Sequence, residues 1–155
     1  MLLQFAILFY HMGQNCHIGN NVEISRRHYL DGTLKIGNYV NFAHNVYLDY
    51  SGDVVIDDHA VLTDGVHILT HDHRFQHEAK TKYDFDDDAI KGNLEICYGA
   101  MIGTKSIITP TCHRIGRFSR VGAGAVVTHD VPDYAVVAGA PAKVIRYLEH
   151  SLDER

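Results

Sequence analysis

The composition of this sequence lacks features that are typical of several common classes of protein. It contains only three cysteines, Cys16, Cys97 and Cys112, an odd number at spacings unlike those of a metal site. We therefore expect free thiols and a cytoplasmic protein rather than a disulfide framework. The formal net charge of -5 and the pI near 6.1 provide no basic surface, which argues against a nucleic-acid partner.

Long apolar runs are also missing. The apolar start of the chain, MLLQFAILFY, lasts for about ten residues, which is too short to cross a bilayer. It lacks the basic start and the small-residue cleavage site of a signal peptide. We therefore expect no membrane insertion.

Neither an amphipathic helix nor an antiparallel sheet accounts for the apolar pattern. A helix repeats its apolar face near every 3.6 residues, and an antiparallel sheet alternates by two between hairpin signals. Here an apolar residue recurs at every sixth position instead, with short slips between groups. The repeating positions form five triplets: Ile18, Ile24, Leu30; Ile36, Phe42, Leu48; Ile56, Leu62, Ile68; Ile96, Ile102, Ile108; and Ile115, Val121, Val127.

A period of six predicts a solenoid in which each hexapeptide forms a short strand and a corner. Three hexapeptides would close one triangular coil of about 18 residues, and strands of successive coils would pair at about 4.8 Å. We predict an all-β parallel β-helix of about five coils, in a single domain over residues 1–155. Glycines after the repeating residue should supply unusual backbone angles at the corners: Gly19, Gly37, Gly103, Gly116 and Gly122.

Three segments fall outside the repeat. We interpret residues 1–15 as a segment that caps the first coil, and residues 74–95 as a long loop after the third coil. The acidic run at Asp84 and 86–88 makes this loop either a lid or a solvated surface segment. Residues 128–155 are predicted to form a crossing segment and a short C-terminal helix over VIRYLEHSLDER, which would cap the open end of the prism.

The units IGNNVE, IGNYVN, IGTKSI, IGRFSR and VGAGAV resemble those of the hexapeptide-repeat acyltransferases. The tail VGAGAVVTHDVPDYAVVAGAPAKVIR, residues 121–146, is similar to the closing signature of the sugar O-acetyltransferases in that family, including the galactoside and maltose acetyltransferases. The resemblance covers residues 16–147. It implies a left-handed β-helix and a homotrimer whose sites lie between subunits.

Two histidines stand together where the repeat stops, His71 and His73, and in an extended segment they point to the same side. Acyl transfer to a hydroxyl needs a base of near-neutral pKa, and histidine is the natural candidate. The resemblance implies a catalytic histidine at the end of a coil, just before the long loop. Counting from Ile56 makes that residue His73, and a shift by one corner would make it His71.

The resemblance also implies a backbone amide as the oxyanion donor, at Thr104, and a coenzyme A groove between subunits. Lys143 and Arg146 would hold the phosphates of the coenzyme. The sequence departs from the family at Met101 and His129, and the asparagine of the acceptor pocket corresponds to Ala43, so the acceptor-binding residues stay open. The positions that match the coenzyme contacts are Thr104, Ala123, Thr128, Lys143 and Arg146.

The implied function is an acetyl-CoA-dependent O-acetyltransferase that acts on a hydroxyl of a sugar or glycan, with acetyl-CoA as co-substrate and no metal. An N-acetyltransferase of an amino sugar, free or nucleotide-linked, would use the same base and stays open. A zinc enzyme of the carbonic-anhydrase type, with His67, His71 and His73 as candidate ligands, is the alternative from another class. A non-catalytic scaffold is the remaining one.

Overall fold

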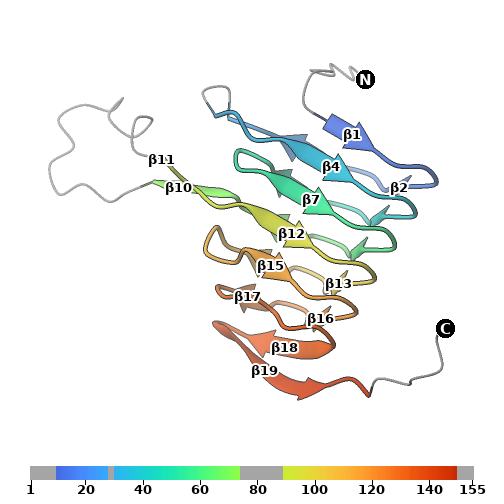
Figure 1. The fold of residues 1–155 in the computed structure, drawn as a ribbon, viewed down its shortest axis with the longest axis vertical. Helices are drawn as coiled ribbons and strands as arrows, with labels where there is room; N and C mark the ends of the chain where they lie inside the picture. The colour runs from blue at the N-terminus through green and yellow to red at the C-terminus, as the bar shows by residue number, and fades with distance from the viewer. Residues whose placement is uncertain (1–9, 28–29, 74–88, 150–155) are drawn as a thin grey trace, which may run out of the picture.

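The computed structural model describes residues 10–27, 30–73 and 89–149, and every regular element within these ranges is a β-strand. No helix in this part of the chain could span a membrane. Three parallel sheets, named A, B and C here, form the walls of a triangular prism (Figure 1). The parallel β-helix predicted from the period of six is therefore present.

Each of the five coils contributes one strand to each wall in turn, and two later strands extend sheet B. Sheet A contains β1 (Tyr10–Met12), β4 (Leu34–Ile36), β7 (Val54–Ile56), β12 (Leu94–Ile96) and β15 (Arg114–Ile115). Sheet B contains β2 (His17–Ile18), β5 (Asn41–Phe42), β8 (Val61–Leu62), β13 (Met101–Ile102), β16 (Arg120–Val121), β18 (Ala135–Gly139) and β19 (Ala142–Tyr147). Sheet C contains β3 (Glu23–Ser25), β6 (Tyr47–Asp49), β9 (His67–Ile68), β14 (Ile107–Ile108) and β17 (Val126–Val127).

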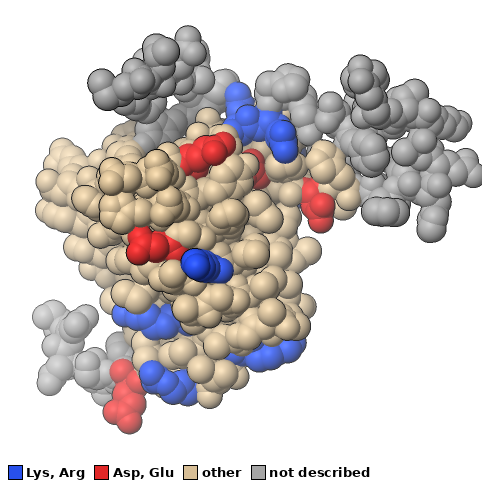
Figure 2. Space-filling model, turned by 180° about the vertical axis from the view of Figure 1, so that it is seen from behind, with Lys and Arg blue, Asp and Glu red and all other residues tan. Residues whose placement is uncertain are grey.

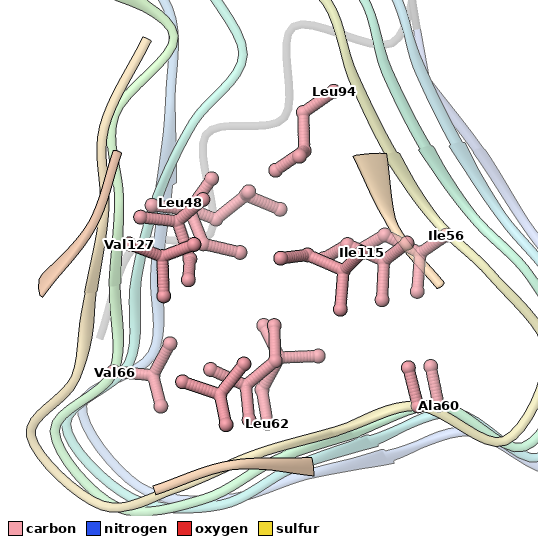
Figure 3. Close-up of a cluster of buried hydrophobic side chains, with 14 of the residues drawn as sticks. Leu48, Ile56, Ala60, Leu62, Val66, Leu94, Ile115 and Val127 are labelled. Carbon is pink, nitrogen blue, oxygen red and sulfur yellow. The ribbon is translucent and has the colours of Figure 1, made fainter. Parts of the chain in front are cut away.

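The core fills the inside of the prism because the coils stack without a shift in register. Ile36, Ile56 and Ile96 are direct partners on neighbouring strands of sheet A, and each is at most 1% exposed. Figure 3 shows side chains from the three walls, among them Leu48 and Leu62, converging on one interior. The predicted sixth positions therefore supply most of the largest fully buried side chains, which burial removes from water.

Glycines at the corners are required by close packing of the backbone rather than by the unusual angles predicted for them. A Cβ on Gly37 would lie 2.7 Å from the backbone nitrogen of Asp58, and one on Gly103 would lie 2.8 Å from that of Ala123. Neither glycine has a positive φ. Tyr39 and His59 adopt the left-handed conformation instead, with φ of 57° and 61°.

The first coil begins earlier than the count from the sequence indicated. β1 pairs with β4, and Met12 is the partner of Ile36, so Met12 stands at the first sixth position of this coil. Residues 10–12, which we assigned to a cap, therefore belong to the prism. Leu30 is outside the repeat. The described residues between β3 and β4, 26–27 and 30–33, form no strand and are an extension of the coil.

The interruption after the third coil contains more regular structure than the loop predicted over 74–95. β10 (His71–His73) and β11 (Ala89–Lys91) pair antiparallel and leave the prism as a two-stranded ribbon (Figure 1). β12 re-enters sheet A at Leu94. The acidic run at Asp84 and 86–88 lies outside the described residues.

The predicted C-terminal helix is wrong over the described residues. β19 pairs antiparallel with β18 and extends sheet B, with Ala138 opposite Lys143 and Val136 opposite Arg146. The edge of β18 offers backbone partners that satisfy a whole strand, and this pairing overrides the local helical preference of the segment. Residues 150–155 lie outside the described part. All three cysteines are free, as predicted.

Candidate active site

His71 lies where the chain leaves the prism, three residues beyond the end of β9 in sheet C. Leu48 and Ile68 are register partners on β6 and β9, so Asp49, which follows Leu48, and Thr70, two residues beyond Ile68, come together. The Nδ1 atom of His71 is 2.7 Å from Oδ2 of Asp49. The side chains of Asp49 and His71 are 2% and 10% exposed, so this pair is largely shielded from water.

The Asp49 carboxylate is saturated with hydrogen-bond donors. Its Oδ1 accepts the backbone N–H and the hydroxyl of Ser51, at 3.1 and 2.5 Å. Its Oδ2 accepts the backbone N–H of Thr70 at 2.9 Å, and the Thr70 hydroxyl lies 3.0 Å away. Burial by itself would raise the pKa of Asp49, but the hydrogen bonds from Ser51, His71 and Thr70 outweigh it and hold the pKa below its ordinary value.

The neighbours of His71 assign its tautomer. An ionised Asp49 can only accept a hydrogen bond, so Nδ1 of His71 carries the proton. On the other side of the ring, Nε of Arg27 donates to Nε2 of His71 at 3.3 Å, which requires a lone pair there. Both contacts give the same result. His71 is held with Nε2 unprotonated, which is the form that a general base needs.

His73 lies on the same face of β10 as His71, as predicted. It does not share the contact that His71 makes with the Asp49 carboxylate. The two rings are 5.5 Å apart between centroids and meet edge to face, at 88°. The backbone N–H of His73 donates to Oδ1 of Asp72 at 2.8 Å. Of the two candidate bases, His71 is therefore the one that the Asp49 carboxylate orients.

Thr104 and Ala123 lie at another edge of the same prism. Thr104 stands at the corner between β13 and β14, and Ala123 at the corner between β16 and β17, both where sheet B turns into sheet C. The Thr104 carbonyl accepts the Gly124 N–H at 2.8 Å. Among the described residues its own N–H has no acceptor. One chain does not bring this amide to His71, which stands where sheet C turns toward sheet A.

The remaining predicted coenzyme contacts lie over the last coils. Thr128 follows β17, and its carbonyl accepts the Thr111 hydroxyl at 2.8 Å. Lys143 and Arg146 are exposed on β19. Figure 2 shows basic side chains over this C-terminal end. A cavity of about 200 Å³ opens there, lined by Val127, His129, Asp130, Val131, Val137, Ala142, Lys143 and Val144.

The three histidines of the zinc hypothesis do not form one cluster within the chain. His67 lies on β9 against Tyr47, with 5.7 Å between ring centroids, while His71 contacts Asp49. Over residues 10–27, 30–73 and 89–149, no three metal-ligating side chains lie close enough together to hold an ion.

Sequence reasoning missed Asp49, Ser51, Thr70 and Arg27. The predicted stacking of the coils could have identified the first three of these residues. Stacking Leu48 on Ile68 in the predicted coils places Asp49 beside the residues that precede His71. No comparable signal existed for Arg27, because it lies in the extension that the period of six does not describe.

No protein-family model matches the chain. It is 33% identical over 136 residues to a probable acetyltransferase of Mycobacterium tuberculosis, a match that covers 87% of this chain and 43% of that protein. It is 30% identical over 139 residues to the galactoside O-acetyltransferase of Escherichia coli, covering 90% of this chain and 57% of that enzyme. The chain thus spans about half the length of these relatives.

Two solved structures have a similar fold. A galactoside acetyltransferase in complex with coenzyme A has a TM-score of 0.72 at 26% identity, over 90% of this chain and 66% of that one. A mutant of an N-acyltransferase from Bacillus cereus, in complex with dTDP and coenzyme A, has a TM-score of 0.67 at 25% identity, over 87% and 75%.

The period of six, the stacked parallel strands and these similarities define the class of the protein, a left-handed β-helix built from hexapeptide repeats. Within that class the chain resembles the hexapeptide-repeat acyltransferases, and the sugar O-acetyltransferases in particular. The resemblance predicted from the sequence is confirmed.

Proposed function

We propose that the protein transfers an acetyl group from acetyl-CoA to a hydroxyl of a sugar or glycan, with His71 as the general base. The observation that carries this proposal is the Asp49–His71 pair, which holds the Nδ1–H tautomer and presents the lone pair of Nε2. The similarity to a galactoside O-acetyltransferase supports the sugar acceptor.

In the proposed reaction, Nε2 of His71 takes the proton of the acceptor hydroxyl while that oxygen attacks the thioester carbonyl. Asp49 stabilises the imidazolium that forms, because its ionised carboxylate faces Nδ1–H. The backbone N–H of Thr104 donates to the developing oxyanion. When the carbon–sulfur bond breaks, Nε2–H returns the proton to the departing thiolate, which restores the neutral base.

The position of Thr104 supports a homotrimer. His71 and Thr104 stand at different edges of one prism, so a base from one copy and an amide from the next can meet only where two prisms lie side by side. We propose that coenzyme A binds in this groove. Thr104, Ala123 and Thr128 would line it, and Lys143 and Arg146 would hold its phosphates, because a guanidinium and an ammonium suit phosphate oxygens.

An amino sugar is the second candidate acceptor. The similarity to an N-acyltransferase crystallised with dTDP supports it, and the same base could take a proton from an attacking amine. Matched acceptors separate the two: release of coenzyme A thiol is followed with galactosides and with amino sugars, including a nucleotide-linked one. Faster turnover of the hydroxyl acceptors favours O-acetylation, and faster turnover of the amines favours N-acetylation.

The role of His71 is tested by replacing each histidine of β10 in turn. His71→Ala should lower turnover by about two to four orders of magnitude, the range for a positioned general base. His73→Ala is the matched control and should cost far less, since His73 does not contact Asp49. Binding of coenzyme A, measured by calorimetry, should be close to wild type in both. A larger loss in His73→Ala would reverse the assignment, and normal transfer in both variants would remove histidine from the mechanism.

A further inference from the structure

Arg27 forms a hydrogen bond with Nε2 of His71, the atom that takes the proton in the proposed reaction. Its Nε donates to Nε2 of His71 at 3.3 Å, across 44 positions of sequence. The contact is supported from the main chain. The backbone N–H of Arg27 donates to the Ser51 hydroxyl at 3.0 Å, and that hydroxyl donates to Asp49 at 2.5 Å. Arg27 is therefore anchored to the same hydrogen-bond network that orients the base.

This contact and a bound acceptor exclude each other. An imidazole nitrogen without a proton has a single lone pair in the ring plane, and the acceptor hydroxyl must reach that lone pair within hydrogen-bonding distance. The guanidinium has to move away when the acceptor binds. Its backbone stays tied to Ser51, so only the side chain moves, and the charged group remains within reach of the acceptor.

The carboxylates described beside the site are already engaged. Asp49 accepts from Ser51, Thr70 and His71. Asp31 forms an ion pair with Lys91, which is the register partner of His71 on the ribbon. Asp72 points away from the face that carries His71 and accepts the N–H of its neighbour. These three carboxylates of the described residues are thus occupied, which leaves an anionic group of the acceptor as a partner for the displaced guanidinium.

We propose that Arg27 determines acceptor specificity by exchanging Nε2 of His71 for an anionic group, a carboxylate or phosphate, carried by the acceptor. A guanidinium is always charged and pairs with these groups through two parallel hydrogen bonds, which are stronger than one bond to a neutral nitrogen. A neutral acceptor offers no such compensation for breaking the Arg27–His71 contact. This inference rests on the proposed role of His71 as the base.

The experiment measures how accessible Nε2 is, without requiring the acceptor to be known. Diethyl pyrocarbonate modifies unprotonated imidazole nitrogen, and mass spectrometry of the His71 peptide gives its rate, with the exposed His113 peptide as internal reference. Arg27→Ala should raise the rate at His71 by about tenfold, because a hydrogen bond from a charged donor shifts the open population by about that factor. Arg27→Met keeps most of the stem without a donor or a charge and should do the same. Arg26→Ala removes an equal charge one residue away and should stay near wild type.

Inorganic pyrophosphate and malonate then serve as probes for the two anionic groups, at constant ionic strength. Either should accelerate modification of His71 in the wild type and in Arg26→Ala, and neither should do so in Arg27→Ala or Arg27→Met. Acceleration by pyrophosphate alone indicates a phosphate-bearing acceptor, and by malonate alone a carboxylate. An unchanged rate in both Arg27 variants, or equal acceleration in them, overturns the inference. Acetyl transfer is assayed separately, so a failure of the proposed function would be visible on its own.

Discussion

Replacing Asp49 by asparagine should damage both the fold and the proposed chemistry, although the two side chains have nearly the same shape. Both carboxylate oxygens of Asp49 face donors only: Oδ1 faces the N–H and hydroxyl of Ser51, and Oδ2 faces the N–H of Thr70 and Nδ1–H of His71. An amide has one oxygen and one NH₂ group. In either orientation the NH₂ group meets a backbone N–H that cannot rotate away.

The expected size of both effects follows from the loss of a hydrogen-bond partner in a buried charged network. Leaving one partner of a buried charged network unpaired costs about 3–5 kcal/mol of unfolding free energy. If the NH₂ group faces His71, it also favours the tautomer with the proton on Nε2, which removes the lone pair of the base. Turnover should then fall by about two to four orders of magnitude. Urea unfolding measures the first quantity, and release of coenzyme A thiol measures the second.

Asp53→Asn is the matched control. Asp53 is exposed, and the hydrogen bonds described for it use Oδ1 alone, which accepts the N–H and the hydroxyl of Thr33 at 2.9 and 2.7 Å. Asparagine keeps that oxygen, so stability should change by less than about 1 kcal/mol. If Asp49→Asn were as stable and as active as Asp53→Asn, the argument from the donors around Asp49 would be wrong.

Because the pKa of Asp49 is lowered in the folded state, the stability of the protein should depend on pH in a definite direction. A carboxyl whose pKa is lower in the folded state stabilises the fold fully above its unfolded pKa of about 3.9. This contribution is lost as the pH falls below that value and through the folded-state pKa. The stability difference between wild type and Asp49→Asn should therefore be constant near neutral pH and shrink below about pH 4. A difference that grew under acid conditions would contradict the direction of the shift.

Three further predictions concern the coenzyme, the core and the assembly. Replacing Lys143 and Arg146 by alanine should weaken binding of coenzyme A more than binding of dephospho-coenzyme A, and equal losses would place the 3′-phosphate elsewhere. Ile56→Ala should lower the free energy of unfolding, measured in urea, by about 2–5 kcal/mol. Val55→Ala changes the outward-facing neighbour, which is 37% exposed, and should lower it far less. Similar losses in the two variants would contradict the assignment of Ile56 to the interior. Light scattering should give the mass of a trimer, and a monomer with full activity would refute a site shared between copies.

The period of six was enough to predict the parallel β-helix and most of its largest buried side chains, because one rule of spacing determines which of them point inward. Ile56, Leu62 and Ile68 are all buried where the repeat places them. The first coil was counted wrongly because Met12, Ile18, Ile24, Leu30 and Ile36 follow one another at a spacing of six without a slip, so the period alone does not show where this coil begins. The last segment was assigned to a helix because local preference says nothing of the free edge that β18 offers to β19.

The site was predictable in location but not in detail. Spacing brought attention to His71 and His73, and counting corners favoured His73. What distinguishes the two is a carboxylate from the preceding coil, and a contact between coils depends on register rather than on local sequence. The same limit applies to Arg27, whose contact with His71 joins an irregular extension to the end of a distant strand.

The ribbon of β10 and β11 leaves the prism after one coil and returns at the next without disturbing the stack. Val54 and Ile56 of β7 pair with Leu34 and Ile36 on one side and, in the same register, with residues of β12 on the other. The strands of these two coils thus pair in the same register whatever the length of the chain between β10 and β11. Evolution or a protein engineer could exchange the residues between β10 and β11 as a module, while the hydrogen bonds that orient the imidazole of His71 stay in place.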